Sequence, residues 1–173
     1  AGLYRAADGQ RLDLVTQEGG GGATEFSLGA ISVAKENLPA DARALPVQTR
    51  LDANLGDEVD LVGATLNQAS LAPGKALEVT LFWRARRDLK DDYTVFLQLL
   101  DSAGKPWAAE DAQPWQGRYP TSRWQAGEAV RDSHTLTLAA DAPDGAYRLI
   151  GGLYRAADKQ RLPVTGLLRT GDS

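Results

Sequence analysis

Apolar and polar residues alternate along short stretches of this chain, and this alternation constrains its fold more than any other feature. The clearest case is residues 77–86, where the charged residues fall on one face together with Phe82. The opposite face carries Leu77, Val79, Leu81, Trp83 and Ala85. A period of two is that of a strand with one buried face. No segment shows a convincing helical stripe, since Pro39 interrupts the best candidate at residues 34–45.

The same reasoning predicts further strands along the chain. They lie at residues 59–66, 93–101, 130–138 and 147–155, with weaker candidates at 106–112 and 161–164. Residues 93–101 are apolar on both faces, which favours a central strand. Proline and glycine mark turns at 72–75, 101–105, 125–128 and 142–145. Short strands separated by such turns predict an all-β fold, an antiparallel β-sandwich of immunoglobulin-like or jelly-roll kind.

The parity of residues within these strands predicts the core of the sandwich. We expect it to contain Trp83, Val95, Leu97, Leu99, Leu136, Leu138 and Leu149. His134 shares the parity of Leu136 and Leu138. A histidine on such a face usually has a structural role, with its ring nitrogens satisfied locally.

Composition excludes several function classes. The chain has no cysteine and a single histidine, so thiol catalysis and sites built from several histidines are excluded. A formal net charge of −4 argues against nucleic-acid binding. We find no signal peptide and no apolar run long enough to span a bilayer. Methionine is absent, and we expect the chain to be a fragment of a longer protein.

Two nearly identical segments lie far apart in the chain. AGLYRAADGQRL at 1–12 and GGLYRAADKQRL at 151–162 share ten of twelve residues, which indicates two related domains in series. We therefore expect 1–33 to be the terminal strands of a preceding domain, 34–50 a linker, and 51–173 the sandwich domain.

The segment after the first repeat has no counterpart after the second. A strand is predicted at residues 24–33, with a bulge near Gly29. We expect this strand to pair with the sandwich and to replace the strand that the second copy lacks. Residues 1–12 then either extend that strand as a hairpin or pair with a neighbouring molecule in a strand-exchanged homodimer.

Several motifs within residues 59–164 resemble a known family. These are WRA (83–85), DYTVFLQLLD (92–101), YPTSRW (119–124), GEAVRD (127–132) and DAPDGAYRL (141–149). Together they resemble the soluble domain of bacterial membrane glycosyltransferases that are similar to the dolichyl-phosphate-mannose protein mannosyltransferases. The resemblance implies a β-sandwich outside the cytoplasm in a membrane-anchored protein. It supplies no catalytic residues, because the transferase chemistry of that family belongs to its membrane part.

Residues 106–124 carry the most unusual composition of the chain, including three of its four tryptophans. Aromatic rings beside carboxylates and arginines suit sugar binding, because the CH faces of a pyranose pack on rings while its hydroxyls bond polar groups. The candidate residues are Trp107, Asp111, Trp115, Arg118, Tyr119 and Trp124. Alternatively, these rings cap the sandwich beneath a loop whose path Pro114 and Pro120 restrict. In either case we expect residues 113–124 to be ordered.

A catalytic role is not predicted for any residue. The carboxylates of Glu110 and Asp111 are adjacent on a strand and point to opposite faces, so they do not form the facing pair that glycoside hydrolysis needs. No cofactor or metal is predicted. We expect a non-catalytic accessory domain whose partner is a glycan or the membrane part of the same protein. A carbohydrate-binding module and a protein-interaction or spacer domain are the alternatives.

Overall fold

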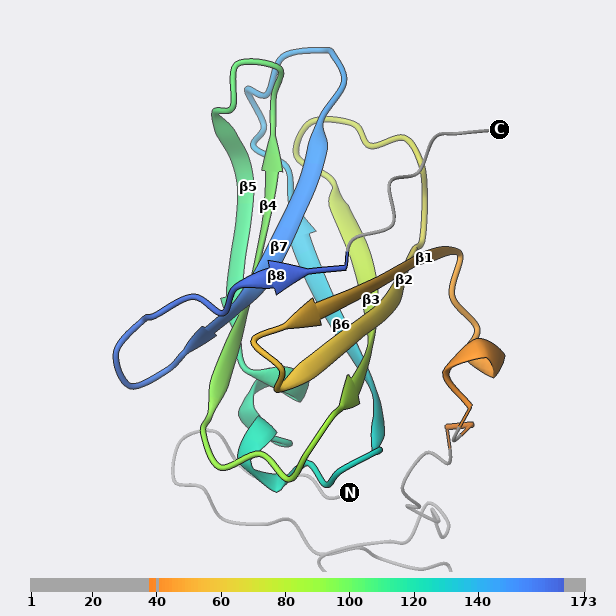
Figure 1. The fold of residues 1–173 in the computed structure, drawn as a ribbon. Coiled ribbons are helices and arrows are strands. Elements are labelled where there is room, and N and C mark those ends of the chain that lie inside the picture. The colour runs from red at the N-terminus through yellow and green to blue at the C-terminus, as the bar shows by residue number, and fades with distance from the viewer. Residues whose placement is uncertain (1–37, 40, 167–173) are drawn as a thin grey trace, which may run out of the picture. The chain divides into compact units, whose positions relative to one another are not determined.

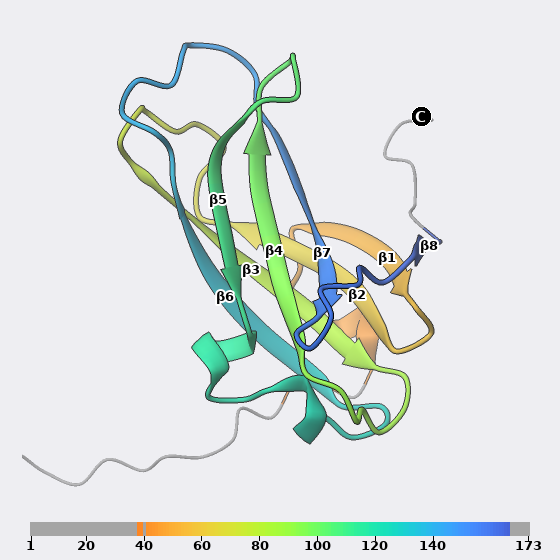
Figure 2. The same ribbon diagram turned by 90° about the vertical axis from the view of Figure 1, so that its left-hand side faces the viewer.

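Two antiparallel sheets face each other in the computed structural model, which describes residues 38–39 and 41–166 (Figures 1 and 2). One sheet has the strand order β6-β3-β2-β1-β8 and the other has the order β5-β4-β7. The strands are β1 (Thr49–Leu55), β2 (Val59–Leu66), β3 (Ala76–Ala85), β4 (Tyr93–Leu100), β5 (Pro106–Ala112), β6 (Ala129–Thr137), β7 (Arg148–Arg155) and β8 (Val164–Thr165). The predicted all-β sandwich is confirmed.

The connections between the sheets follow a Greek key. The chain passes from β3 into the second sheet at β4, returns from β5 to β6 beside β3, and crosses again to β7 beside β4. The pairs β3–β6 and β4–β7 correspond to the B–E and C–F pairs of the immunoglobulin-type sandwich. Figure 2 shows the three-stranded sheet in front of the larger one.

The strands predicted between residues 59 and 155 are found within a residue or two of their predicted bounds. Of the weak candidate at 161–164, only Val164 lies in a strand, the two-residue β8. Strand β1 was not predicted, because its alternation rests on Leu51, Ala53 and Leu55 among residues that strands disfavour. Asp52 adopts φ 46°, at a shift in the β1–β2 register. The helices within the described residues of the chain are three short 3-10 turns, η1 (Ala42–Ala44), η2 (Pro114–Gly117) and η3 (Thr121–Arg123).

The main core lies between the two sheets. Six of the seven predicted core residues are buried, namely Trp83, Val95, Leu97, Leu99, Leu136 and Leu138. The prediction for Leu149 was only partly right, because its side chain is half-buried. Leu149 belongs to β7, an edge strand within the described residues, and lines two cavities that open beside it.

A second, smaller core lies on the outer face of the five-stranded sheet. Leu45, Val62 and Phe82 are buried there, and Leu38, Ala42 and Val47 pack against them. Phe82 has the parity of the polar face, so it needs a cover that the other sheet does not supply. The described part of the segment expected to be a linker, from Leu38 onward, provides this cover. The expectations for residues 1–33, including the strand at 24–33, lie outside the described residues.

No helix among residues 38–39 and 41–166 has the length and apolar character that crossing a lipid bilayer requires. In the same residues no group of three or more histidine and acidic side chains is arranged to hold a metal ion.

Candidate functional site

The connection from β5 to β6 begins with a turn in an unusual backbone conformation. Trp115 and Gln116 both have φ 54°, in the left-handed region, and Gly117 follows with φ 79°. Left-handed backbone at a residue other than glycine costs on the order of 1–3 kcal/mol and persists only where the surroundings enforce it. Two such residues in sequence therefore need strong external contacts.

Those contacts come from the edge strands of both sheets. The Trp115 amide donates to Asp132 Oδ1 at 3.0 Å, and its indole Nε1 donates to the Arg131 carbonyl at 2.6 Å. The Gln116 side-chain amide donates to Glu110 Oε1 at 3.1 Å. Asp132 lies on β6 and Glu110 on β5, so the turn is fastened to one edge of each sheet.

Beneath this turn lies a cluster of one histidine and two carboxylates. His134 Nε2 lies 2.7 Å from Asp132 Oδ2 in a hydrogen bond, and both side chains are almost completely buried. On the other side of the ring, Nδ1 lies 3.3 Å from Glu110 Oε2, an ion-pair distance without hydrogen-bond alignment. Glu110 Oε2 also accepts from the Thr135 amide at 3.0 Å. The cluster joins β5 to β6 across the rim of the sandwich.

The carboxylates decide the charge of the imidazole. Burial lowers the pKa of His134, but the hydrogen bond and charge of Asp132, together with Glu110, outweigh burial and raise the pKa above its usual value. The ring lies between the two carboxylates, with Nε2 hydrogen-bonded to Asp132 and Nδ1 at ion-pair distance from Glu110. Both carboxylates therefore favour the protonated form of this buried imidazole.

This arrangement predicts a pH-dependent contribution to stability. Because the folded-state pKa lies above the unfolded value of about 6.5, the contribution of His134 is complete below that pH and is lost as pH rises through the raised pKa. We expect the difference in unfolding free energy between the wild type and His134→Gln to shrink from pH 6 to pH 9. Urea unfolding of both proteins at several pH values measures this difference in unfolding free energy. A difference that does not change with pH would contradict the raised pKa of His134.

The structure brings three of the six predicted site residues together. The Trp115 and Tyr119 rings lie 6.1 Å apart between centroids with their planes tilted by 52°, and Arg118 Nε donates to the Trp115 carbonyl at 3.3 Å. Trp115 is 43% exposed. The Tyr119 hydroxyl donates to Glu128 Oε1 at 2.7 Å, which fixes its ring. Residues 113–124 all lie within the described part of the chain.

The other three predicted residues lie elsewhere. Trp124 is buried in the main core, where its indole donates to the Tyr119 carbonyl, so it offers no ring face to a ligand. Trp107 belongs to the β4–β5 end of the sandwich, where its indole donates to Asp101 Oδ2 and Lys105 lies over its ring. Asp111 accepts from the Tyr154 hydroxyl of β7 at 3.0 Å. These residues stabilise the sandwich at separate places.

His134 has the structural role expected for it, with Asp132 as the local partner of its Nε2, but the parts played by Glu110 and Asp132 were not predicted. A signal was present, because Asp132 shares the parity of His134 and Leu136 and is therefore predicted to face inward. Two polar residues at neighbouring inward positions require a common polar partner. Glu110 could not be chosen as that partner without the pairing of the sheets.

Comparison of the chain with models of known protein families finds no matching family, and a search of curated proteins finds no match either.

Proposed function

We propose that this sandwich is a non-catalytic accessory domain of a membrane-bound, glycosyltransferase-like protein and works outside the cytoplasm. The proposed membrane-bound parent protein and the location outside the cytoplasm rest on the family resemblance across residues 59–164. The observation that carries the non-catalytic role is that the carboxylates around the candidate site form structural hydrogen bonds. Each is bonded to a structural group and holds two elements together.

The contacts of these carboxylates account for their presence. Asp132 bonds the Trp115 amide and His134, Glu110 bonds Thr135 and Gln116, and Asp111 bonds Tyr154. A general acid or base needs a proton path to a bound substrate. The buried Asp132–His134 pair instead lies beneath the backbone of the η2 turn. Hydrogen bonds of this pair therefore serve to stabilise the η2 turn.

An activity assay tests this proposal directly. We expect the chain to hydrolyse no aryl glycoside and to transfer no sugar from a polyprenyl-phosphate donor above the buffer blank. Turnover that disappears in Glu110→Gln, while that variant keeps the wild-type circular dichroism, would overturn the proposal.

Carbohydrate binding at the Trp115 turn is a second candidate function, favoured by the exposure of this ring. Its indole nitrogen is held by the Arg131 carbonyl, so the ring is oriented before any ligand arrives. Arg118 and Tyr119 beside it supply polar groups for sugar hydroxyls. The strained turn is consistent with a ligand contact, because strain of this kind clusters at such sites.

Tryptophan fluorescence separates this second function from a purely structural loop. Trp83 and Trp124 are buried, whereas solvent reaches the ring of Trp115. A saccharide that stacks on Trp115 therefore changes the emission of this exposed ring. We expect saturable quenching by the glycan that binds, a loss of at least tenfold in affinity in Trp115→Ala, and wild-type affinity in the control Trp107→Phe. A glycan array supplies the candidate sugars. Absence of saturable quenching by every sugar tested would remove this function.

A further inference from the structure

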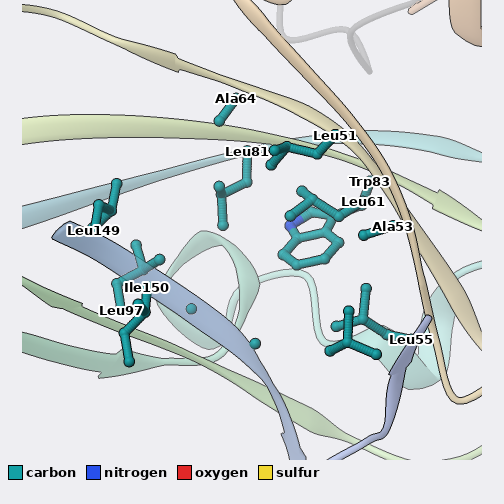
Figure 3. A pocket seen from close by; sticks show the side chains of 13 residues that line it. Leu51, Ala53, Leu55, Leu61, Ala64, Leu81, Trp83, Leu97, Leu149 and Ile150 are labelled. Carbon is teal, nitrogen blue, oxygen red and sulfur yellow. The ribbon is translucent and has the colours of Figure 1, made fainter. Parts of the chain in front are cut away.

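An apolar cavity of about 320 Å³ lies between the two sheets beside β7 (Figure 3). Side chains of both sheets form its walls, among them Leu55, Leu61 and Leu81 from the larger sheet and Leu97 and Leu149 from the smaller. Val164 of β8 also lines the cavity and is 43% exposed, so the cavity reaches the protein surface there. Protein interiors rarely contain spaces much larger than a water molecule. A space of this size therefore needs a physical explanation.

Small residues on the walls leave this space unfilled. Ala53 of β1, Ala64 of β2 and Gly151 of β7 all line the cavity, at positions where a larger side chain would project into it. The packing around Gly151 also keeps this residue small. A Cβ atom at Gly151 would lie 2.6 Å from Leu97 Cδ2 and 2.9 Å from the Phe96 carbonyl oxygen, which is too close for any side chain. The cavity is therefore built into the way these strands pack.

A buried hydrogen-bond donor belongs to the wall of this cavity. Trp83 is 1% exposed and lines the cavity, and its indole Nε1 has no hydrogen-bond partner among the described residues. Figure 3 shows this nitrogen on the side of the indole that faces the interior of the cavity. An indole nitrogen can only donate. A buried N–H without an acceptor destabilises the fold, and an acceptor oxygen in the cavity would remove that cost.

The walls suit an organic molecule better than water. A buried water typically makes about three hydrogen bonds. Among the residues of the described chain that line the cavity, Trp83 is the one whose side chain carries a polar group. A water bonded to this single donor would keep most of its hydrogen-bonding groups unpaired. An apolar molecule with one oxygen satisfies the indole and also fills the space between the leucines.

The lining also defines the charge and size of such a molecule. The residues of the described chain that line the cavity are all uncharged, so an ionised group would be buried there without a counter-charge. The molecule must therefore be neutral. An apolar cavity of roughly 150 Å³ takes up one benzene molecule. A cavity of about 320 Å³ suits a molecule of about twice that size, on the order of ten to twelve non-hydrogen atoms.

We propose that this cavity binds a small, neutral, apolar molecule that carries one carbonyl, ester or hydroxyl oxygen, and that Trp83 Nε1 donates a hydrogen bond to this oxygen. The leucines of both sheets contact the hydrocarbon part. The Trp115 turn is fastened to β5 and β6, at the ends of the two sheets opposite to β7 and β8. The site is therefore separate from the Trp115 turn and does not depend on carbohydrate binding there.

A pair of two-ring probes, α-tetralone and tetralin, tests the proposal on the whole chain. They share one carbon skeleton and differ in a single carbonyl oxygen. We expect α-tetralone to bind saturably in an NMR titration, with one molecule per chain. At ten times its dissociation constant it should raise the Tm by about 3–5 °C. The indole N–H resonance of Trp83 should move downfield with α-tetralone and far less with tetralin. Absence of saturable binding would overturn the proposal.

Trp83→Phe tests the hydrogen bond, because it removes the indole N–H and keeps an aromatic ring. The change enlarges the cavity for both probes alike, so the measured quantity is the ratio of their dissociation constants. We expect the affinity for α-tetralone to fall about tenfold relative to that for tetralin. An unchanged ratio, together with an indole resonance that responds equally to both probes in the wild type, would overturn the role of Trp83.

Two alanine-to-leucine variants test the location of the site. Ala64→Leu places a larger side chain in the cavity and should abolish saturable binding of both probes. The matched control Ala109→Leu adds the same atoms at an exposed position of β5 and should leave both affinities unchanged. Trp115→Ala should also leave them unchanged. Binding that survives Ala64→Leu, or that is lost in Trp115→Ala, would show that the probes bind elsewhere and would overturn the proposal.

Discussion

Replacement of Trp83 by alanine is expected to lower the free energy of unfolding by about 3–5 kcal/mol. Trp83 lies on β3, in the middle of the five-stranded sheet, and is 1% exposed. It packs within the main core between the two sheets. Alanine removes one of the two tryptophans of that core and joins the new void to the cavity that Trp83 already lines. The strands around it cannot close this space, because their backbone is fixed by ladders on both sides.

Urea unfolding of the wild type and the variant at one pH measures this loss. The matched control is Trp115→Ala, which removes an equally large ring from an exposed position and should cost less than about 1 kcal/mol. A loss below about 1 kcal/mol for Trp83→Ala would mean that β3 presents its other face to the core.

Replacement of Asp132 by alanine is expected to cost a similar amount, about 3–5 kcal/mol at pH 7. The Asp132 side chain is fully buried and bonds both His134 and the Trp115 amide. Its loss leaves a buried imidazole without its nearest counter-charge and the part-buried Trp115 N–H without its acceptor. It also releases the strained η2 turn. We expect faster hydrogen exchange at the Trp115 amide and a more exposed Trp115 in fluorescence.

Two controls separate these effects of Asp132. Asp111→Ala removes a carboxylate from the neighbouring strand β5, where it bonds only the exposed Tyr154 hydroxyl among the contacts described, and should cost far less. The double variant Asp132→Ala/His134→Ala should recover part of the loss, because it removes the unpaired imidazole. If the double variant is as unstable as the sum of the two single variants, the two side chains are not coupled.

Much of the fold was predictable from local pattern alone. Alternation is strict in β6 and is broken in β3 by Phe82, and in β4 apolar residues fill both faces, so the strands and the parity of Trp83 and Leu136 follow from a period of two. Strand β1 was not predicted, because aspartate and asparagine occupy its outward positions and its stability comes from pairing with β2. Phe82 looked anomalous on a polar face until Leu45 and Val62 were seen to cover it.

What the sequence by itself determined is most of the set of elements: every strand but β1, the turns between them, the inward face of each predicted strand and the duplicated segment. These depend on neighbours along the chain, and local sterics and solvation decide them. Only the tertiary structure decided which strand edges meet. It placed Glu110 of β5 against His134 of β6, separated Trp107 and Trp124 from Trp115, and left an apolar cavity between the sheets beside β7. Each of these outcomes depends on pairings between residues distant in sequence, which a period of two does not encode.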